Sequence, residues 1–99
     1  MRLSPSQCDA IKQQAVLIFG DRLSVYVFGS RTDDQARGGD IDLFIELYTC
    51  TEQAVAKSLQ LNAALQALFG MQKIDIIVHQ PTDAWFPVHL EAKQYGILL

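Results

Sequence analysis

The chain has 99 residues, of which 49% are hydrophobic and 19% are charged, so residues 1–99 have room for one small domain with an apolar core. Eight Lys and Arg against eleven Asp and Glu give a net charge of −3, which argues against a nucleic-acid surface, because such a surface needs clustered basic residues. No apolar run approaches the roughly 18 residues of a membrane span, and the first residues do not form a secretory leader, so we expect a cytoplasmic protein.

A helix is predicted near the start of the sequence. Ser4 is a good N-cap residue, Pro5 suits the first helical position, and Gln7 completes a capping box. Gly20 is a good terminator. Between them, apolar residues recur at spacings of three and four and form one stripe that we expect to pack against the rest of the fold: Cys8, Ile11, Ala15 and Ile18.

Two apolar runs follow, joined by a polar stretch. The first run, residues 25–28, is β-branched and aromatic and stops at Gly29, where backbone amides can approach a ligand unhindered by a side chain. The second run alternates, which predicts a strand with Ile41, Leu43, Ile45 and Leu47 on one face. The other face carries Asp40, Asp42, Phe44 and Glu46. We expect Glu46, at the far end, to be solvated.

Asp40 and Asp42 project from the same face of this second strand. Their Cα atoms are expected roughly 6.5 Å apart from the rise of a strand. Two carboxylates so placed repel each other unless a cation lies between them. Because Mg²⁺ takes oxygen ligands and binds through one or two carboxylates plus substrate phosphates, the pattern indicates a site for a divalent cation and a nucleotide.

The next segment predicts a second helix and a third strand. Residues 49–52 form a capping-box candidate, and the helix should end near Gly70. Its predicted inner side is Val55, Leu59, Asn62, Leu65 and Phe69. In the strand over residues 73–78, Asp75 interrupts an apolar run, and because a buried unpaired carboxylate is costly, Asp75 must be neutral, exposed or compensated by a cation. From the residues alone, a surface role and a site role for Asp75 are both open.

The last segment predicts a helix that begins at Pro87 and ends at Gly96. Its packed face is expected to hold Val88, Ala92 and Tyr95. His79 and His89 are too far apart in sequence for a helical metal pair, and we expect both to be ordinary partly buried or surface residues. Trp85 and Phe86 are expected to be core or interface anchors. The predicted fold class is therefore α/β, with at least three strands and with helices packed on the sheet.

Two motifs carry a resemblance to a known family. Phe28-Gly-Ser-Arg31 is separated from Asp40-Ile-Asp42 by a polar stretch that ends in Gly38-Gly39. This pattern resembles the signature of the DNA polymerase β-like nucleotidyltransferases. More narrowly, the chain resembles the short minimal nucleotidyltransferases that are paired with helical HEPN-type proteins in toxin–antitoxin modules. The match extends more loosely over residues 18–78.

The resemblance implies a polymerase β-like core with a mixed sheet, and it also implies residue roles. Asp40 and Asp42 would bind Mg²⁺, with two ions expected and Mn²⁺ as a substitute. Asp75 would complete the site and accept a proton. Gly29 and Ser30 would hold the triphosphate of ATP or another NTP. For Arg31, a contact with a phosphate and a salt bridge with a neighbouring aspartate remain alternatives.

The implied function is transfer of a nucleoside monophosphate, AMP from ATP above all, to a hydroxyl of a partner protein, as the antitoxin of a HEPN-type toxin. The alternative is a non-catalytic antitoxin that neutralises a helical toxin by binding alone. Three acids favour the enzyme, because a binding module gains nothing obvious from mutually repelling carboxylates. Larger relatives add whole domains for their acceptors, so acceptor recognition here is expected to come from a partner or from an interface between copies of the chain.

Overall fold

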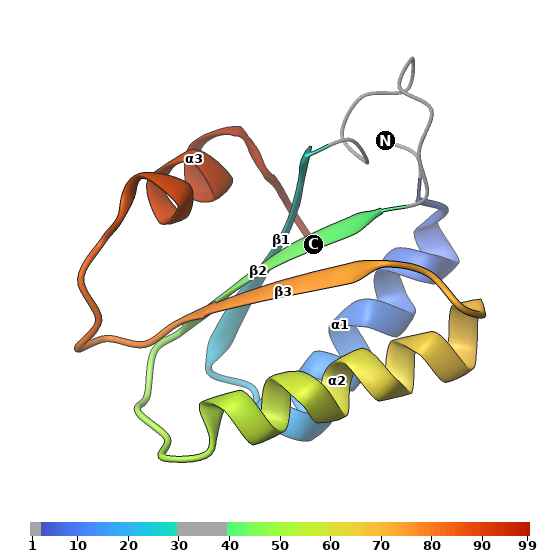
Figure 1. Cartoon of the computed structure of the whole chain (residues 1–99), viewed down its shortest axis with the longest axis horizontal. Helices are drawn as coiled ribbons and strands as arrows, with labels where there is room; N and C mark the ends of the chain where they lie inside the picture. The colour runs from blue at the N-terminus through green and yellow to red at the C-terminus, as the bar shows by residue number, and fades with distance from the viewer. Residues whose placement is uncertain (1–2, 30–39) are drawn as a thin grey trace.

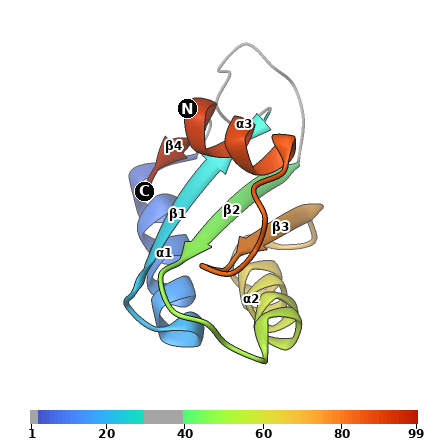
Figure 2. The ribbon, with the colours of Figure 1, turned by 90° about the vertical axis from the view of Figure 1, so that its left-hand side faces the viewer.

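The sheet consists of four strands and carries helices on both faces (Figures 1 and 2). This is a computed structural model that describes residues 3–29 and 40–99. Within these residues, the elements are α1 (Pro5–Phe19), β1 (Leu23–Phe28), β2 (Ile41–Leu47), α2 (Ala54–Phe69), β3 (Ile74–His79), α3 (Pro87–Tyr95) and β4 (Ile97–Leu98). The strand order is β3-β2-β1-β4. Because β1 is antiparallel to β2 and β4 while β2 and β3 are parallel, the sheet is mixed. The predicted α/β class is confirmed, and the arrangement is compatible with a polymerase β-like core.

The first helix forms as its sequence predicts. The Ser4 hydroxyl accepts a hydrogen bond from the Gln7 N–H at 3.1 Å, and the Gln7 side chain accepts one from the Ser4 N–H at 2.9 Å. These bonds satisfy two donors that the first turn of a helix leaves without partners. Of the predicted stripe, Ile11 and Ala15 are fully buried.

The two faces of the sheet are covered by different helices. Helices α1 and α2 lie side by side on one face, and α3 lies on the other (Figures 1 and 2). The main core fills the layer under α1 and α2, and it includes Val25, Val27, Ile41, Leu43, Ile45, Leu61 and Leu65. Because α3 covers part of the opposite face, Phe44 and Glu46 are buried as well. The expectation that Glu46 is solvated is wrong for this reason.

The second helix differs from its prediction in its start and in its buried side. It begins at Ala54 after Gln53, without a side-chain cap, so the capping box over residues 49–52 does not form. Leu61 and Leu65 are buried, whereas Val55 and Leu59 are 75% and 65% exposed. Alanine and leucine lie all round this helix, so its periodicity is weak and tertiary packing decides which side faces the sheet.

The C-terminal segment contains one element that the sequence did not predict. Helix α3 begins at Pro87 as expected, but Ala92 is its buried residue, while Val88 and Tyr95 of the predicted face are exposed. After it, β4 pairs with β1 through two residues. None of the helices in residues 3–29 and 40–99 is long and apolar enough to cross a membrane.

Candidate functional site

Three strand ends meet at one edge of the sheet and bring the predicted acidic residues together. Asp42 lies opposite Phe28 of antiparallel β1 and opposite Asp75 of parallel β3. Residues that are opposite each other on neighbouring strands point to the same face, so the Asp42 and Asp75 side chains share a face. Asp40 immediately precedes β2. All three predicted acids therefore lie at the edge where β1 ends and where β2 and β3 begin.

Gly29 closes β1 directly beside the Asp42 carboxylate. Its φ of +76° lies in the left-handed region that side-chain-bearing residues rarely adopt. A Cβ atom at this position would collide with Asp42 Oδ2, so glycine allows the backbone to approach the carboxylate closely. Ser30 and Arg31 lie outside the described residues, and their predicted contacts with a nucleotide stay predictions.

Negative charge is concentrated around Asp42. Burial, followed by the negative charges of Asp75 and Asp40 and a hydrogen bond with the Asp75 carboxyl, raises the pKa of Asp42. Lys73 opposes this shift. Its Nζ lies 3.9 Å from Asp75 Oδ2 and 4.0 Å from Asp40 Oδ2. Asp40 and Asp75 thus share one ammonium group.

The donor chemistry of these three residues fits a divalent cation. All the available ligands are carboxylate oxygens, which Mg²⁺ and Mn²⁺ prefer, and the raised pKa of Asp42 indicates that positive charge would stabilise its ionised form. Within residues 3–29 and 40–99, however, no three His, Cys, Asp or Glu side chains are grouped so that they could already hold a metal ion. Binding of a metal ion therefore requires the acidic side chains to rearrange from the positions that they have here.

Helix α2 fixes the backbone that leads into β3. Asn62 Nδ2 donates to the Ile74 carbonyl at 2.7 Å. The Gln66 side chain accepts from the Gln72 N–H at 2.8 Å and donates back to the Gln72 carbonyl. From the other side, the Ile41 N–H donates to the Lys73 carbonyl at 2.9 Å. The sequence signal for these hydrogen bonds was a polar residue, Asn62, within an apolar helix. We expected Asn62 only to lie on the packed side of that helix.

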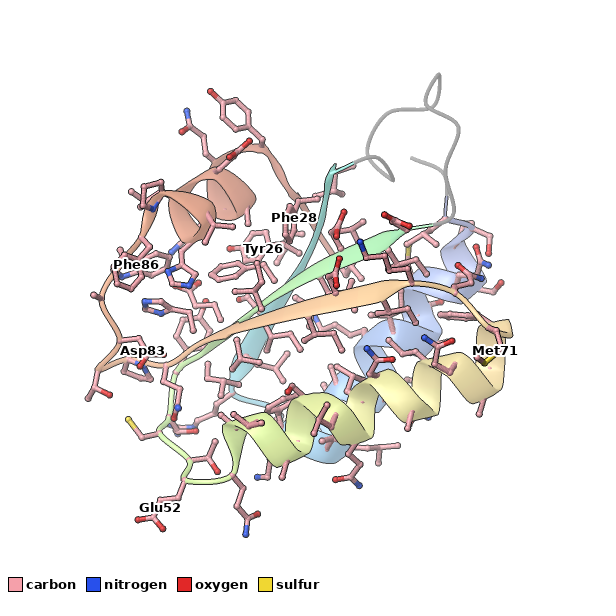
Figure 3. All side chains as sticks on the ribbon, viewed as in Figure 1. Tyr26, Phe28, Glu52, Met71, Asp83 and Phe86 are labelled. Atoms are coloured by element: carbon pink, nitrogen blue, oxygen red, sulfur yellow. The ribbon has the colours of Figure 1, made fainter. Side chains whose placement is uncertain are left out.

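A second polar cluster lies farther along the same face, under α3. Glu46 is 6% exposed, and its carboxylate accepts hydrogen bonds from Lys93 Nζ at 2.9 Å and from the Tyr48 hydroxyl at 3.2 Å. Lys93 also lies over the Trp85 ring, 5.1 Å from its centroid. These contacts tie α3 to the sheet. Figure 3 shows Tyr26 on the same side of the sheet and Phe86 just before α3 begins.

The two histidines belong to this cluster. His79 is 2% exposed and stacks on Trp85 with ring centroids 3.9 Å apart, and the His89 ring meets its edge at 4.9 Å. Among the described atoms, His79 Nε2 is buried without a hydrogen-bond partner. The prediction that both are ordinary residues missed the contact between their rings. The two histidines are ten residues apart in the sequence, and the chain between β3 and α3 brings them together. Trp85, which was expected to be a core or interface anchor together with Phe86, packs against His79 and Phe44. It is nevertheless 40% exposed and Phe86 is 60% exposed, so neither is a core residue.

Comparison with known proteins adds no assignment to this geometry, because no family model matches the chain and no curated protein gives a significant match. The family resemblance therefore depends on the motif residues alone.

Proposed function

We propose that the chain is a Mg²⁺-dependent nucleotidyltransferase that moves AMP from ATP to a hydroxyl of a partner protein. One observation supports this proposal above the others: the sheet register sets Asp42 opposite Asp75, with the Gly29 backbone against the Asp42 carboxylate. Asp40 adds a third carboxylate at the same edge. A fold that keeps these charges together at one open edge gains from a cation that binds there.

In this proposal Asp40, Asp42 and Asp75 hold the metal. Bound Mg²⁺ would supply positive charge for the phosphate oxygens and would lower the pKa of the attacking hydroxyl. Asp42 is close enough to Asp75 and Asp40 for both charges to raise its pKa, so the three carboxylates could hold the metal together. Asp75 belongs to the outer strand, and its side chain is 53% exposed, so it can reach an acceptor hydroxyl and take its proton. Gly29, whose backbone lies against the Asp42 carboxylate, would contact the phosphates next to the metal.

The openness of this edge supports a protein acceptor. The side chains of Asp40 and Asp75 are 48% and 53% exposed. Two hollows on the described surface, of about 390 and 310 Å³, lie along α1 and between α2 and β3, and the three acids line neither of them. Water must be excluded for charge stabilisation to be strong, so we infer that a docked partner closes the site. A helical HEPN-type toxin is the partner that the motif resemblance suggests, with the chain acting as its antitoxin.

One observation favours the second candidate function, a non-catalytic antitoxin that acts by binding alone. Lys73 already provides a cation to Asp40 and Asp75, so part of the repulsion is relieved without metal. This candidate does not explain why Asp42, which is partly buried and feels the charges of both other acids, is itself an acid. The two functions differ in whether metal and nucleotide bind at all.

Calorimetry with ATP tests the proposal directly. ATP should bind only with Mg²⁺ or Mn²⁺, and the two together should raise the melting temperature more than either alone, because ligands stabilise the state that they bind. Tight ATP binding in excess chelator would contradict the metal-bridged site.

Mass spectrometry can identify the acceptor. The protein encoded by the neighbouring gene would be co-purified with the chain and incubated with ATP and Mg²⁺, and a mass increase by one AMP would show that it is the acceptor.

Gly29 offers a test of the contact with Asp42. Gly29→Ala should lower the free energy of unfolding by about 1–3 kcal/mol, because a side chain is strained at positive φ. It should also displace the Asp42 carboxylate and abolish the joint stabilisation by Mg²⁺ and ATP. Gly20→Ala is the matched control, since Gly20 has a φ of +94° but open space around an added Cβ. Equal responses to Mg²⁺ and ATP in both variants would argue against a role for Asp42 in ligand binding.

A further inference from the structure

Lys73 lies beside the acids of the candidate site, just before β3. Its Nζ is within 4.0 Å of carboxylate oxygens from two segments of the chain, Asp40 before β2 and Asp75 in β3. The Lys73 side chain is 68% exposed, so its ammonium group can leave the carboxylates without disturbing the core. The Lys73 ammonium group thus lies near the carboxylates that would bind Mg²⁺ in the proposed function.

The backbone of Lys73 is held more firmly than its side chain. Its carbonyl accepts from Ile41 on one side, and on the other side Asn62 and Gln66 of α2 bind the backbone of the two neighbouring residues. A lysine has a flexible four-carbon stem and a strongly hydrated point charge. The fixed backbone keeps the ammonium group near the acids, and the flexible stem allows it to turn outward.

We propose that Lys73 is a built-in counter-ion that competes with the divalent cation for Asp40 and Asp75, and that its displacement couples binding of the cation to binding of the nucleotide. The inference rests on the proposed function. A divalent ion needs the same carboxylate oxygens at 2.0–2.6 Å, and an ammonium group at 4 Å from them repels it. The phosphates of a bound nucleotide offer the displaced ammonium a new anionic partner, so the cation with nucleotide binds better than the cation alone.

Titration with Mn²⁺ by calorimetry tests the competition. Without nucleotide, Lys73→Met should bind Mn²⁺ about three- to tenfold more tightly than the original chain, as expected for the loss of two exposed ion pairs with the acids. A non-hydrolysable ATP analogue should then increase the Mn²⁺ affinity of the original chain by a larger factor than that of Lys73→Met. Lys57→Met, on α2, is the control for loss of one positive charge and should change neither value. Thermal melting of the metal-free variants verifies that each one folds.

The outcomes separate the two proposals. Equal Mn²⁺ affinity in Lys73→Met and the original chain, with binding lost in Asp42→Asn, would overturn the competition but leave the proposed function in place. Weaker Mn²⁺ binding in Lys73→Met would also overturn it, because Lys73 would then assist the cation. If Mn²⁺ binds to none of the proteins, with or without the ATP analogue, both proposals fail.

Discussion

Asp42→Asn is expected to reduce AMP transfer by about 10³-fold or more while it raises the free energy of unfolding of the metal-free protein. The loss follows if Asp42 holds the metal, because removing one preorganised charge-stabilising group costs on this scale. The gain in stability follows from the crowding of Asp42 with Asp75 and Asp40, since a neutral amide is not repelled by either one. Activity and stability should therefore change in opposite directions, which a general folding defect does not produce.

Labelled AMP incorporation into the partner, measured beside urea unfolding, tests this result. Asp21→Asn is the matched control, because Asp21 is an exposed aspartate in the turn between α1 and β1. It should leave both quantities unchanged. Undiminished labelling in Asp42→Asn would defeat the catalytic assignment and make the binding-only antitoxin the better interpretation.

The pH dependence of stability gives an independent test of the same residue. The pKa of Asp42 in the folded protein is raised above its ordinary value of 3.8, so the folded state binds the proton more tightly than the unfolded state does. Its favourable contribution is therefore fully present below pH 3.8 and is lost as the pH rises through the folded pKa. The stability advantage of Asp42→Asn in the metal-free protein should grow over that interval and then become constant. Unfolding in urea at a series of pH values measures the difference.

Local sequence rules predicted the elements that depend on neighbouring residues. The capping box at Ser4 set the start of α1, Pro87 set the start of α3, and alternation over residues 41–47 assigned the two faces of β2. The same alternation put Asp42 on the face that carries the site. A strand, a helix and another strand in succession favour a parallel pair, and this topology is what sets Asp75 beside Asp42.

Features that depend on distant parts of the chain could not be predicted in the same way. The buried side of α2 was predicted correctly at Leu65 but not at Val55 and Leu59, which are exposed, and Leu61 was missed. Apolar residues surround the helix axis, so only contacts with β3 and α1 decide which of them are buried. The burial of Glu46 could not be predicted locally, because it depends on α3 packing over this residue. Lys93 of α3, which pairs with Glu46, lies 47 residues farther along the chain. The ammonium bridge from Lys73 likewise depends on the register of β2 and β3.

Lys93→Met is expected to lower the free energy of unfolding by about 2 kcal/mol, because it leaves the buried Glu46 carboxylate without its ammonium partner. Removing one member of a buried ion pair costs about 3–5 kcal/mol, and we expect less here because the Lys93 side chain is 46% exposed and the Tyr48 hydroxyl still donates to Glu46. The chain has a single tryptophan, Trp85, directly beneath the Lys93 ammonium. Its fluorescence therefore reports whether α3 leaves the sheet.

The double variant Glu46→Gln with Lys93→Met decides whether the unpaired charge is the cause. A neutral amide at position 46 can keep the Tyr48 hydrogen bond without a buried charge, so the double variant should regain at least about half of the stability that Lys93→Met loses.

The hydrogen bond to Glu46 raises the pKa of Lys93 above 10.5, so the stabilisation by the pair is fully present below that pH and is lost as the pH rises through the raised value. As the pH rises from neutral, the original chain and Lys93→Met should accordingly not converge in stability until the solution is strongly alkaline. Lys57→Met is the control, and an equal loss of stability in that variant, or no recovery in the double variant, would show that Glu46 and Lys93 do not hold α3 on the sheet.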